Sequence, residues 1–174
     1  MAWRALNDMS RIWASGMPKA LKLRFFHATV ETVLLYGCEA WTLTKALTKT
    51  LDGTYTRMLR KVQNISWRDH ITNARLYGKI PALSEKIRER TMKLAGHCHR
   101  HPELPASRLI TWEPTHGQRS RGGQRTTLLK TLMQHAGVSS KEELAACMED
   151  RAGWRARARG SRLRSASRRG SEST

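Results

Sequence analysis

Acidic residues are scarce in this sequence: aspartate and glutamate together number 14, against 32 lysines and arginines, and the formal net charge is +18. The excess is uneven, because residues 101–150 are electrically neutral while residues 51–100 and 151–174 each carry +7. A charge of this size opposes compaction and attracts polyanions. RNA or DNA is therefore the expected partner, since neutralising phosphates releases condensed counterions.

Long apolar runs are also missing, which argues against a membrane partner. The best of them, Val33–Tyr36, falls far short of the roughly 20 residues that a spanning helix needs. The N-terminus lacks the apolar stretch and cleavage site of a signal peptide. The three cysteines, Cys38, Cys98 and Cys147, are odd in number and far apart, unlike a disulfide framework. These absences indicate an intracellular protein, and the arginine-rich C-terminus is typical of a nuclear targeting patch.

Recognisable catalytic constellations are absent from the sequence. Two-metal polymerases and nucleases need clustered carboxylates, whereas the acids of the first 100 residues are scattered singly. Asp69 and His70 form a lone dyad, and there is no phosphate-binding Gly-x-x-x-x-Gly-Lys motif. We therefore expect no catalysis and no cofactor of the chain's own.

Apolar residues recur at helical spacing along most of the chain, which predicts a mainly α fold. Helices are expected over Ala2–Ser15, Lys19–Tyr36, 44–65, Thr72–Tyr77, Ser84–His99, 126–137 and 140–156. The clearest stripe lies in the third of these, at Leu47, Leu51, Tyr55, Met58, Val62 and Ile65. Strand is the competing interpretation for Val30–Tyr36, and a short strand over Leu109–Trp112 is also considered.

Local signals indicate where these helices begin and how the chain divides. Thr44, Ser84 and Thr126 or Thr127 are candidate helix starts, and Ser140 with Glu143 makes a capping box. The predicted organisation is a helical bundle over 1–65, connecting helices and a basic loop over 66–125, C-terminal helices over 126–156, and a disordered Arg/Ser tail over 157–174.

Two groups of cationic residues are candidate phosphate contacts. Arg57, Arg60 and Lys61 lie off the apolar stripe of the third helix, and Arg68 follows it beside Trp67, a candidate for stacking on bases. The second group, in a glycine-containing loop whose alternative interpretation is a solvated linker, is Arg119, Arg121 and Arg125. Trp3, Trp13 and Trp41 are expected in the core.

A histidine cluster admits a metal interpretation. His97 and His101 are four residues apart on a predicted helix, Cys98 lies beside them, and His116 could approach from the loop. Zinc favours four such nitrogen or sulfur ligands, but there is no Cys-x-x-Cys pair and Cys98 also belongs to an apolar stripe. The alternative, which we favour, is a helix end whose histidines form ordinary hydrogen bonds.

The segment Val33–Thr44 (Val-Leu-Leu-Tyr-Gly-Cys-Glu-Ala-Trp-Thr-Leu-Thr) resembles a segment just downstream of the catalytic palm in reverse transcriptases of non-LTR retrotransposons. Further matching segments continue in order over about residues 1 to 156, among them 51–60, 66–70, 84–90, 95–106, 112–117 and 148–154. Gly122-Gly123-Gln124 departs from the Gly-Arg-Pro of related elements, and the Arg/Ser tail has no counterpart.

The resemblance implies the thumb and the following region of a retroelement polyprotein, without its endonuclease, fingers and palm. In that family the thumb grips the template–primer duplex, and the polymerase needs Mg²⁺ in the palm. We therefore expect a non-catalytic fragment that contacts RNA or DNA backbone. The alternatives are an inert degraded remnant, or a small zinc-dependent nucleic-acid-processing protein using the His97–His101 cluster.

Overall fold

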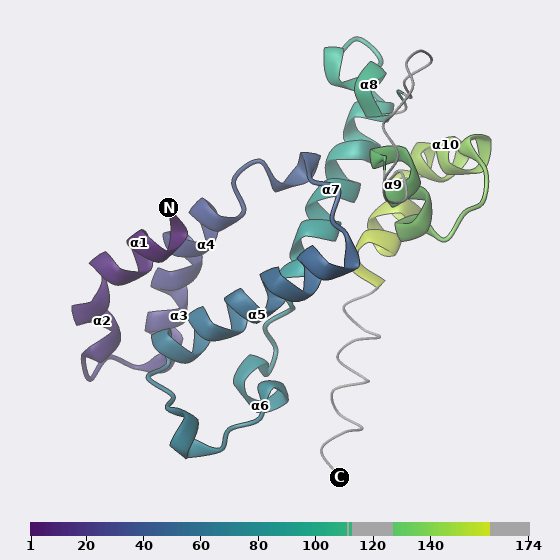
Figure 1. Cartoon of the computed structure of the whole chain (residues 1–174). Helices are drawn as coiled ribbons and strands as arrows, with labels where there is room; N and C mark the ends of the chain where they lie inside the picture. The colour runs from purple at the N-terminus through teal and green to yellow at the C-terminus, as the bar shows by residue number, and fades with distance from the viewer. Residues whose placement is uncertain (111, 113–126, 161–174) are drawn as a thin grey trace, which may run out of the picture. The chain divides into compact units, whose positions relative to one another are not determined.

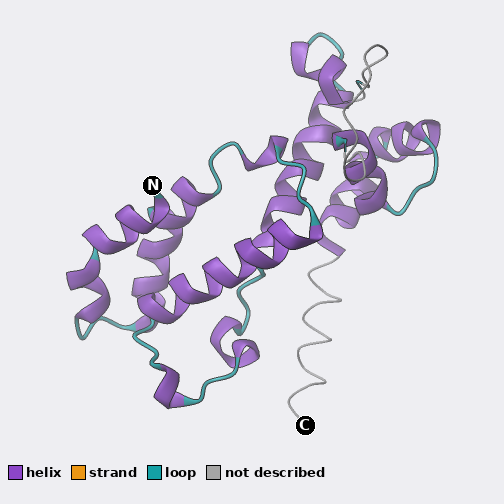
Figure 2. Ribbon diagram, in the orientation of Figure 1, coloured by secondary structure: helices purple, strands orange, loops and turns teal. Residues whose placement is uncertain are grey.

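The computed structural model describes residues 1–110, 112 and 127–160. These residues form helices joined by loops, with no strand among them (Figures 1 and 2), so the predicted mainly α fold is confirmed. The α-helices are α1 (Ala2–Asp8), α2 (Ser10–Ala14), α3 (Lys19–Ala28), α4 (Val30–Leu34), α5 (Lys45–Val62), α6 (Asn73–Tyr77), α7 (Leu83–His99), α8 (Pro105–Ile110), α9 (Leu128–Ala136) and α10 (Lys141–Glu149). Two 3-10 turns, η1 (Cys38–Ala40) and η2 (Trp67–Asp69), and a helical segment over 151–160 complete the described part.

The described residues divide into two compact units. Unit 1 comprises Met1–Gly37 and Lys45–Ser84, and unit 2 comprises Cys38–Thr44 and the residues described from Glu85 onward. Residues 66–84 therefore lie in the same unit as the N-terminal helices. The sequence suggests a grouping with the basic loop instead. No helix in the part of the chain that the structure describes is long and apolar enough to cross a bilayer.

Unit 1 is a cluster of short helices packed on the long helix α5. Helix α4 packs against α1 and α3, and α5 packs against α3 and α6 (Figure 1). The core is built from the predicted stripe of α5 and from large apolar residues of the other helices, namely Leu6, Trp13, Phe26, Val30, Leu35, Tyr55, Met58, Leu59, Val62, Leu76, Tyr77 and Leu83. The amphipathic stripe of α5 therefore organises this unit.

The first two predicted helices are each broken in two. Between α1 and α2 the chain turns at Met9, and the Trp13 indole Nε1–H donates to the Leu6 carbonyl at 2.7 Å. Between α3 and α4, the Thr29 hydroxyl donates to the Phe25 carbonyl at 2.7 Å. Such back-bonding by threonine bends helices. The strand alternative for Val30–Tyr36 is wrong, because Val30–Leu34 is helical.

Helix α5 begins directly after Thr44 as predicted but ends at Val62, before Ile65. Asn64 adopts a left-handed conformation with φ 54°, and the Ile65 N–H donates to the Arg60 carbonyl at 2.9 Å. This pattern is typical of a Schellman C-cap, which asparagine can close in place of glycine. The predicted helical position of Ile65 is therefore wrong.

Helix α7 is capped by a partner that lies far away in the sequence. The predicted cap, Ser84, lies inside the helix, and both its N–H and its hydroxyl donate to the Asp52 carboxylate, at 2.9 and 2.7 Å. A carboxylate at a helix N-terminus also interacts favourably with the helix dipole. Asp52 therefore joins α5 to the start of α7 within unit 1.

Unit 2 has its own core, in which α7, α9 and α10 bury Met92, Ala95, Cys98, Leu132, Leu144 and Met148 with Trp154 and Ala158 of the segment 151–160. The predicted caps of α9 and α10 are confirmed: Thr127 accepts from the Lys130 N–H, and Ser140 accepts from the Glu143 N–H.

Two predictions for this half are wrong. Leu109 and Ile110 belong to helix α8, which Pro105 begins, rather than to a strand. The predicted disordered tail begins too early, because the helix over 151–160 continues past Arg157 and buries Ala158. Residues 161–174 lie outside the described part.

Candidate nucleic-acid interface

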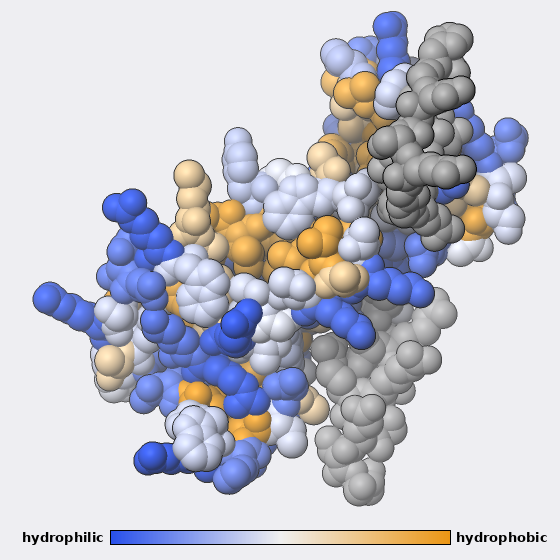
Figure 3. All heavy atoms as spheres, viewed as in Figure 1, coloured by the Kyte–Doolittle hydropathy of each residue, from blue (hydrophilic) through white to orange (hydrophobic). Residues whose placement is uncertain are grey.

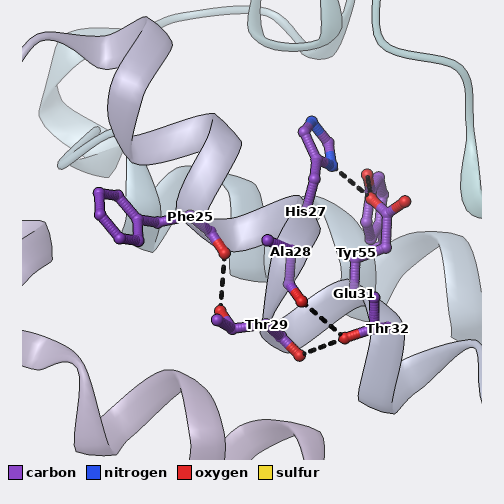
Figure 4. Close-up of polar contacts among 7 residues, drawn as sticks. All are labelled: Phe25, His27, Ala28, Thr29, Glu31, Thr32 and Tyr55. Carbon is purple, nitrogen blue, oxygen red and sulfur yellow. Dashed lines mark hydrogen bonds and ion pairs between the residues drawn. The ribbon is translucent and has the colours of Figure 1, made fainter.

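Three of the four carboxylates of unit 1 accept hydrogen bonds within the fold. Glu31 is 9% exposed, and its Oε2 accepts a hydrogen bond from the Tyr55 hydroxyl at 2.6 Å and lies 2.6 Å from His27 Nδ1. Figure 4 shows His27 and Tyr55 converging on this oxygen from α3 and α5. Burial, followed by the Glu31 charge and hydrogen bond, raises the pKa of Tyr55, so the phenol stays protonated as a donor. Glu31 therefore ties three helices together rather than lying on the surface.

Two further carboxylates of unit 1 act as caps. Asp52 binds Ser84 at the start of α7, as described above. Asp69 closes the turn η2, because its Oδ2 accepts from the Ser66 N–H at 2.6 Å. Of the four carboxylates in this unit, only Asp8 has no such structural role among the described residues.

The lysines and arginines of unit 1, unlike its carboxylates, lie mostly at the surface. The unit holds thirteen lysines and arginines. Within the described residues none of them forms an ion pair, since the one pair in this unit joins His27 to Glu31. Eleven of the thirteen are exposed. The surface of unit 1 therefore carries positive charge that the fold itself does not neutralise.

Two of the predicted contacts, Arg57 and Lys61, share a face of α5. They are four residues apart, which places them on the same side of a helix, and both are exposed. The Lys61 ammonium donates to Asn7 Oδ1 of α1 at 2.6 Å. This contact brings the C-terminal half of α5 against α1, and Figure 3 shows hydrophilic side chains gathered over α1, α2 and this half of α5.

The Lys61–Asn7 contact adds two cations that the sequence analysis missed. Arg4 precedes Asn7 by about one turn of α1, and Arg11 lies on α2, beyond the break at Met9; both are exposed. Spacing alone could have grouped them, because they lie off the apolar positions Leu6 and Trp13. We call Arg4, Arg11, Arg57, Lys61 and Arg68 the cationic face.

Trp67 and Arg68 project from the turn η2, which follows α5. The Trp67 side chain is 77% exposed, and the Arg68 guanidinium lies over the ring, 5.4 Å from its centroid. Trp13 is buried as predicted, at 2% exposed, but Trp3 is 40% exposed, so its predicted place in the core is wrong. Trp3 lies on the short helix α1, which buries only the face that holds Leu6.

Two cations of unit 1 are drawn into the fold by hydrogen bonds to backbone carbonyls. Arg60, predicted as a phosphate contact, is half-buried, and its Nη2 donates to the Ile71 carbonyl at 2.7 Å and to Asn73 Oδ1 at 3.0 Å. Lys22 is buried, and its ammonium donates to the carbonyls of Trp13 and Ser15, at 2.6 and 2.7 Å. Arg60 therefore positions the chain after η2, and Lys22 caps the end of α2.

The remaining predicted site residues do not form one site in the described structure. Arg119, Arg121, Arg125 and His116 lie outside the described residues. The rings of His97 and His101 are neighbours, with centroids 4.6 Å apart.

Cys98 lies in the core of unit 2 and is 2% exposed, and His101 pairs with Glu103 at 2.9 Å. No group of three or more metal-ligating side chains occurs among the residues described. The favoured interpretation of this cluster, a helix end with ordinary hydrogen bonds, fits these contacts.

A second row of cations runs along α7 in unit 2, but acids neutralise part of it. Arg90 and Lys93 are exposed, at positions that share a face. Arg90 lies 3.7 Å from Glu39, and Lys93 lies 2.8 Å from Glu89. The cationic face of unit 1 has no such partners among the described residues, so it is the stronger candidate for binding a polyanion.

Comparison with known proteins finds a distant relationship to a transposon-derived protein. Over 128 residues the chain is 28% identical to a putative uncharacterized transposon-derived protein of Caenorhabditis elegans. The aligned part covers 70% of this chain and 46% of the relative, so the chain spans less than half of that protein's length. No family model and no solved structure matches the chain.

Proposed function

We propose that the chain binds RNA or DNA without sequence specificity, through phosphate contacts from the cationic face of unit 1. The observation that carries the proposal is the unequal use of charge in this unit. Its carboxylates Glu31, Asp52 and Asp69 are engaged within the fold, whereas its surface cations have no ionic partners among the described residues.

Phosphate binding follows from this arrangement on physical grounds. Exposed lysine and arginine side chains without ionic partners repel one another, and a nucleic-acid backbone relieves that repulsion while releasing its counterions. The contacts are to phosphate, so they position the chain on a backbone without reading its sequence. Arginine adds bidentate hydrogen bonds to phosphate oxygens, and three of the four cations that lie on helices of the face are arginines.

The proposal also assigns this binding to a retroelement context. The relative is described as transposon-derived, and the resemblance of Val33–Thr44 and the segments around it is to the region after the palm of a non-LTR retrotransposon reverse transcriptase. We infer a thumb-like role in gripping template RNA or DNA, and a nuclear site of action. We propose binding rather than catalysis for this unit, because Glu31, Asp52 and Asp69, three of its four carboxylates, are engaged in caps and in the core.

The test is the salt dependence of affinity for a fluorescently labelled 20-base-pair duplex, measured by anisotropy. Each phosphate contact contributes about 0.9 to the slope of log K against log salt. The triple variant Arg57→Ala/Lys61→Ala/Arg68→Ala should therefore bind more weakly and show a slope shallower by about 2.7. Its circular dichroism and thermal melt should match those of the wild type, because the three side chains are exposed.

A matched control removes the same number of charges elsewhere in unit 1. Lys19, Lys45 and Lys49 are exposed and lie outside the cationic face. Their triple substitution by alanine should leave the slope within about one contact of the wild type. Equal losses in both triple variants would show that total charge, and not the cationic face, drives binding. Absence of binding by the wild type at low salt would refute the function itself.

A further inference from the structure

The turn η2 presents the most exposed tryptophan of the described residues. Trp67 is 77% exposed, compared with 62% for Trp112 and 40% for Trp3. Water around a large exposed aromatic ring is unfavourable, so a soluble fold normally covers such a side chain. Here the ring extends from the short turn η2, which follows α5 in the chain and also carries Arg68 of the cationic face.

The turn that carries Trp67 is held by hydrogen bonds on both sides of the ring. Before it, the Ser66 N–H donates to Asp69 Oδ2 at 2.6 Å, and the Arg68 N–H donates to Ser66 Oγ at 3.4 Å, which together form a capping box. After it, His70 ends the turn in a left-handed conformation, with φ 45°. Arg60 then fixes the next carbonyl, that of Ile71, at 2.7 Å. The backbone beneath the ring is thus ordered before any ligand arrives, which reduces the entropy lost on binding.

Arg68 supplies the second part of a stacking arrangement. Its guanidinium lies over the Trp67 ring, 5.4 Å from the centroid, and a planar guanidinium stacks on flat π systems as readily as it binds phosphate. One face of the indole is therefore paired with a cation of the same chain. A nucleobase can stack on the opposite face of the ring.

We propose that Trp67 and Arg68 form a stacking platform for an unpaired nucleobase, so that unit 1 prefers single-stranded nucleic acid over a backbone of equal charge without bases. The proposal rests on the proposed function, because the cationic face must first hold the backbone. Bases inside a duplex have both faces covered by their neighbours, whereas those of a single strand are free to stack on aromatic side chains. The platform accepts any base, since every base has a π face.

The experiment compares three probes of equal backbone length at one low salt concentration: a 12-nucleotide oligo(dT), a fully abasic 12-nucleotide strand and a 12-base-pair duplex. The wild type should bind oligo(dT) at least about fivefold more tightly than the abasic strand, the effect of one stacked base. Trp67→Ala should remove this preference and leave affinity for the abasic strand and the duplex within twofold. Trp67→Phe, which keeps an aromatic face, should retain most of the preference.

Trp112→Ala serves as the matched control, because Trp112 is also exposed but lies in unit 2. This variant should keep the full preference for oligo(dT). A wild type that binds all three probes alike, or a Trp67→Ala variant that loses affinity for all three equally, overturns the platform while leaving phosphate binding in place. A wild type that binds none of the probes overturns the proposed function as well.

Discussion

The same glycine-to-alanine substitution should change stability in opposite directions at two helical positions. Gly53 lies in α5, where an added Cβ would meet no neighbouring atom within 4 Å and the methyl group would enter open space. Gly96 lies in α7, where an added Cβ would fall 2.5 Å from both Cδ1 and Nε1 of the Trp154 indole. Both sites gain equally in helix propensity, so the difference between them reports the contacts at Gly96, chiefly with Trp154 and secondarily with Arg100 Nη1 at 3.2 Å.

The magnitudes decide the sign at each site. Replacing glycine by alanine inside a helix stabilises by about 0.8–1 kcal/mol, which is the whole effect expected for Gly53→Ala. At Gly96 the indole must move, and overpacking of a core costs about 1–3 kcal/mol. Movement also disturbs the Trp154 Nε1–H donation to the Met92 carbonyl, a buried hydrogen bond of 2.6 Å, and an unsatisfied buried donor costs about 1–3 kcal/mol more. Gly96→Ala should therefore be destabilising by about 1–5 kcal/mol.

Urea denaturation followed by circular dichroism at 222 nm measures both free energies, and tryptophan fluorescence reports the environment of Trp154 in the folded state. We expect a higher urea midpoint for Gly53→Ala and a lower one for Gly96→Ala, with an altered fluorescence spectrum only in the latter. Stabilisation by Gly96→Ala equal to that by Gly53→Ala would refute the close packing of Trp154 on α7.

Two further predictions concern buried titratable groups. Tyr55→Phe removes a donor from the buried Glu31 carboxylate and should cost about 1.5–3 kcal/mol in urea denaturation; a loss below about 0.5 kcal/mol, on the order of a surface change, would contradict that network. Burial, followed by the charge of Arg88, lowers the pKa of His135 from 6.5 to about 4, so between these pH values the unfolded chain binds a proton that the folded chain does not. The free energy of unfolding should therefore fall as pH drops from 6.5 to 4, by about 1–2 kcal/mol after allowance for partial exposure. The His135→Gln variant should show a flatter dependence on pH. A pH profile unchanged by this substitution would refute the role of His135.

Features that depend on neighbouring residues in the sequence could be predicted without the structure. Thr127 and Gly137 bound helix α9 because a hydroxyl caps its start and a left-handed glycine ends it, with φ 71°. Trp13 and the stripe positions Tyr55, Met58 and Val62 of α5 are buried because their periodicity gives one apolar face, whereas Leu47 at the start of the stripe is 50% exposed. The exposure of Trp67 followed from its place in a connecting segment beside Arg68.

Features that depend on particular side-chain contacts could not be predicted from local propensity. The helix is interrupted at Met9, where the Trp13 indole donates to the Leu6 carbonyl, and no local propensity signals this. Arg60 has the same spacing signature as Arg57, yet it is drawn inward by the Ile71 carbonyl, which reaches it only after the chain reverses. One wrong prediction had a local remedy. The short apolar run at Leu109 and Ile110 is compatible with a strand or a helix, and Pro105, a typical first residue of a helix, favours the helix α8.

Lysine footprinting tests the central claim most directly, namely that the cationic face of unit 1 contacts nucleic acid. Lys49 and Lys61 are both exposed on α5, separated along its axis by about 18 Å, so they report on two ends of one helix. On addition of a 20-base-pair duplex at low salt, acetylation of Lys61 should slow severalfold, while acetylation of Lys49 should not change. Equal protection of the two lysines, or protection of neither, would contradict the proposed interface.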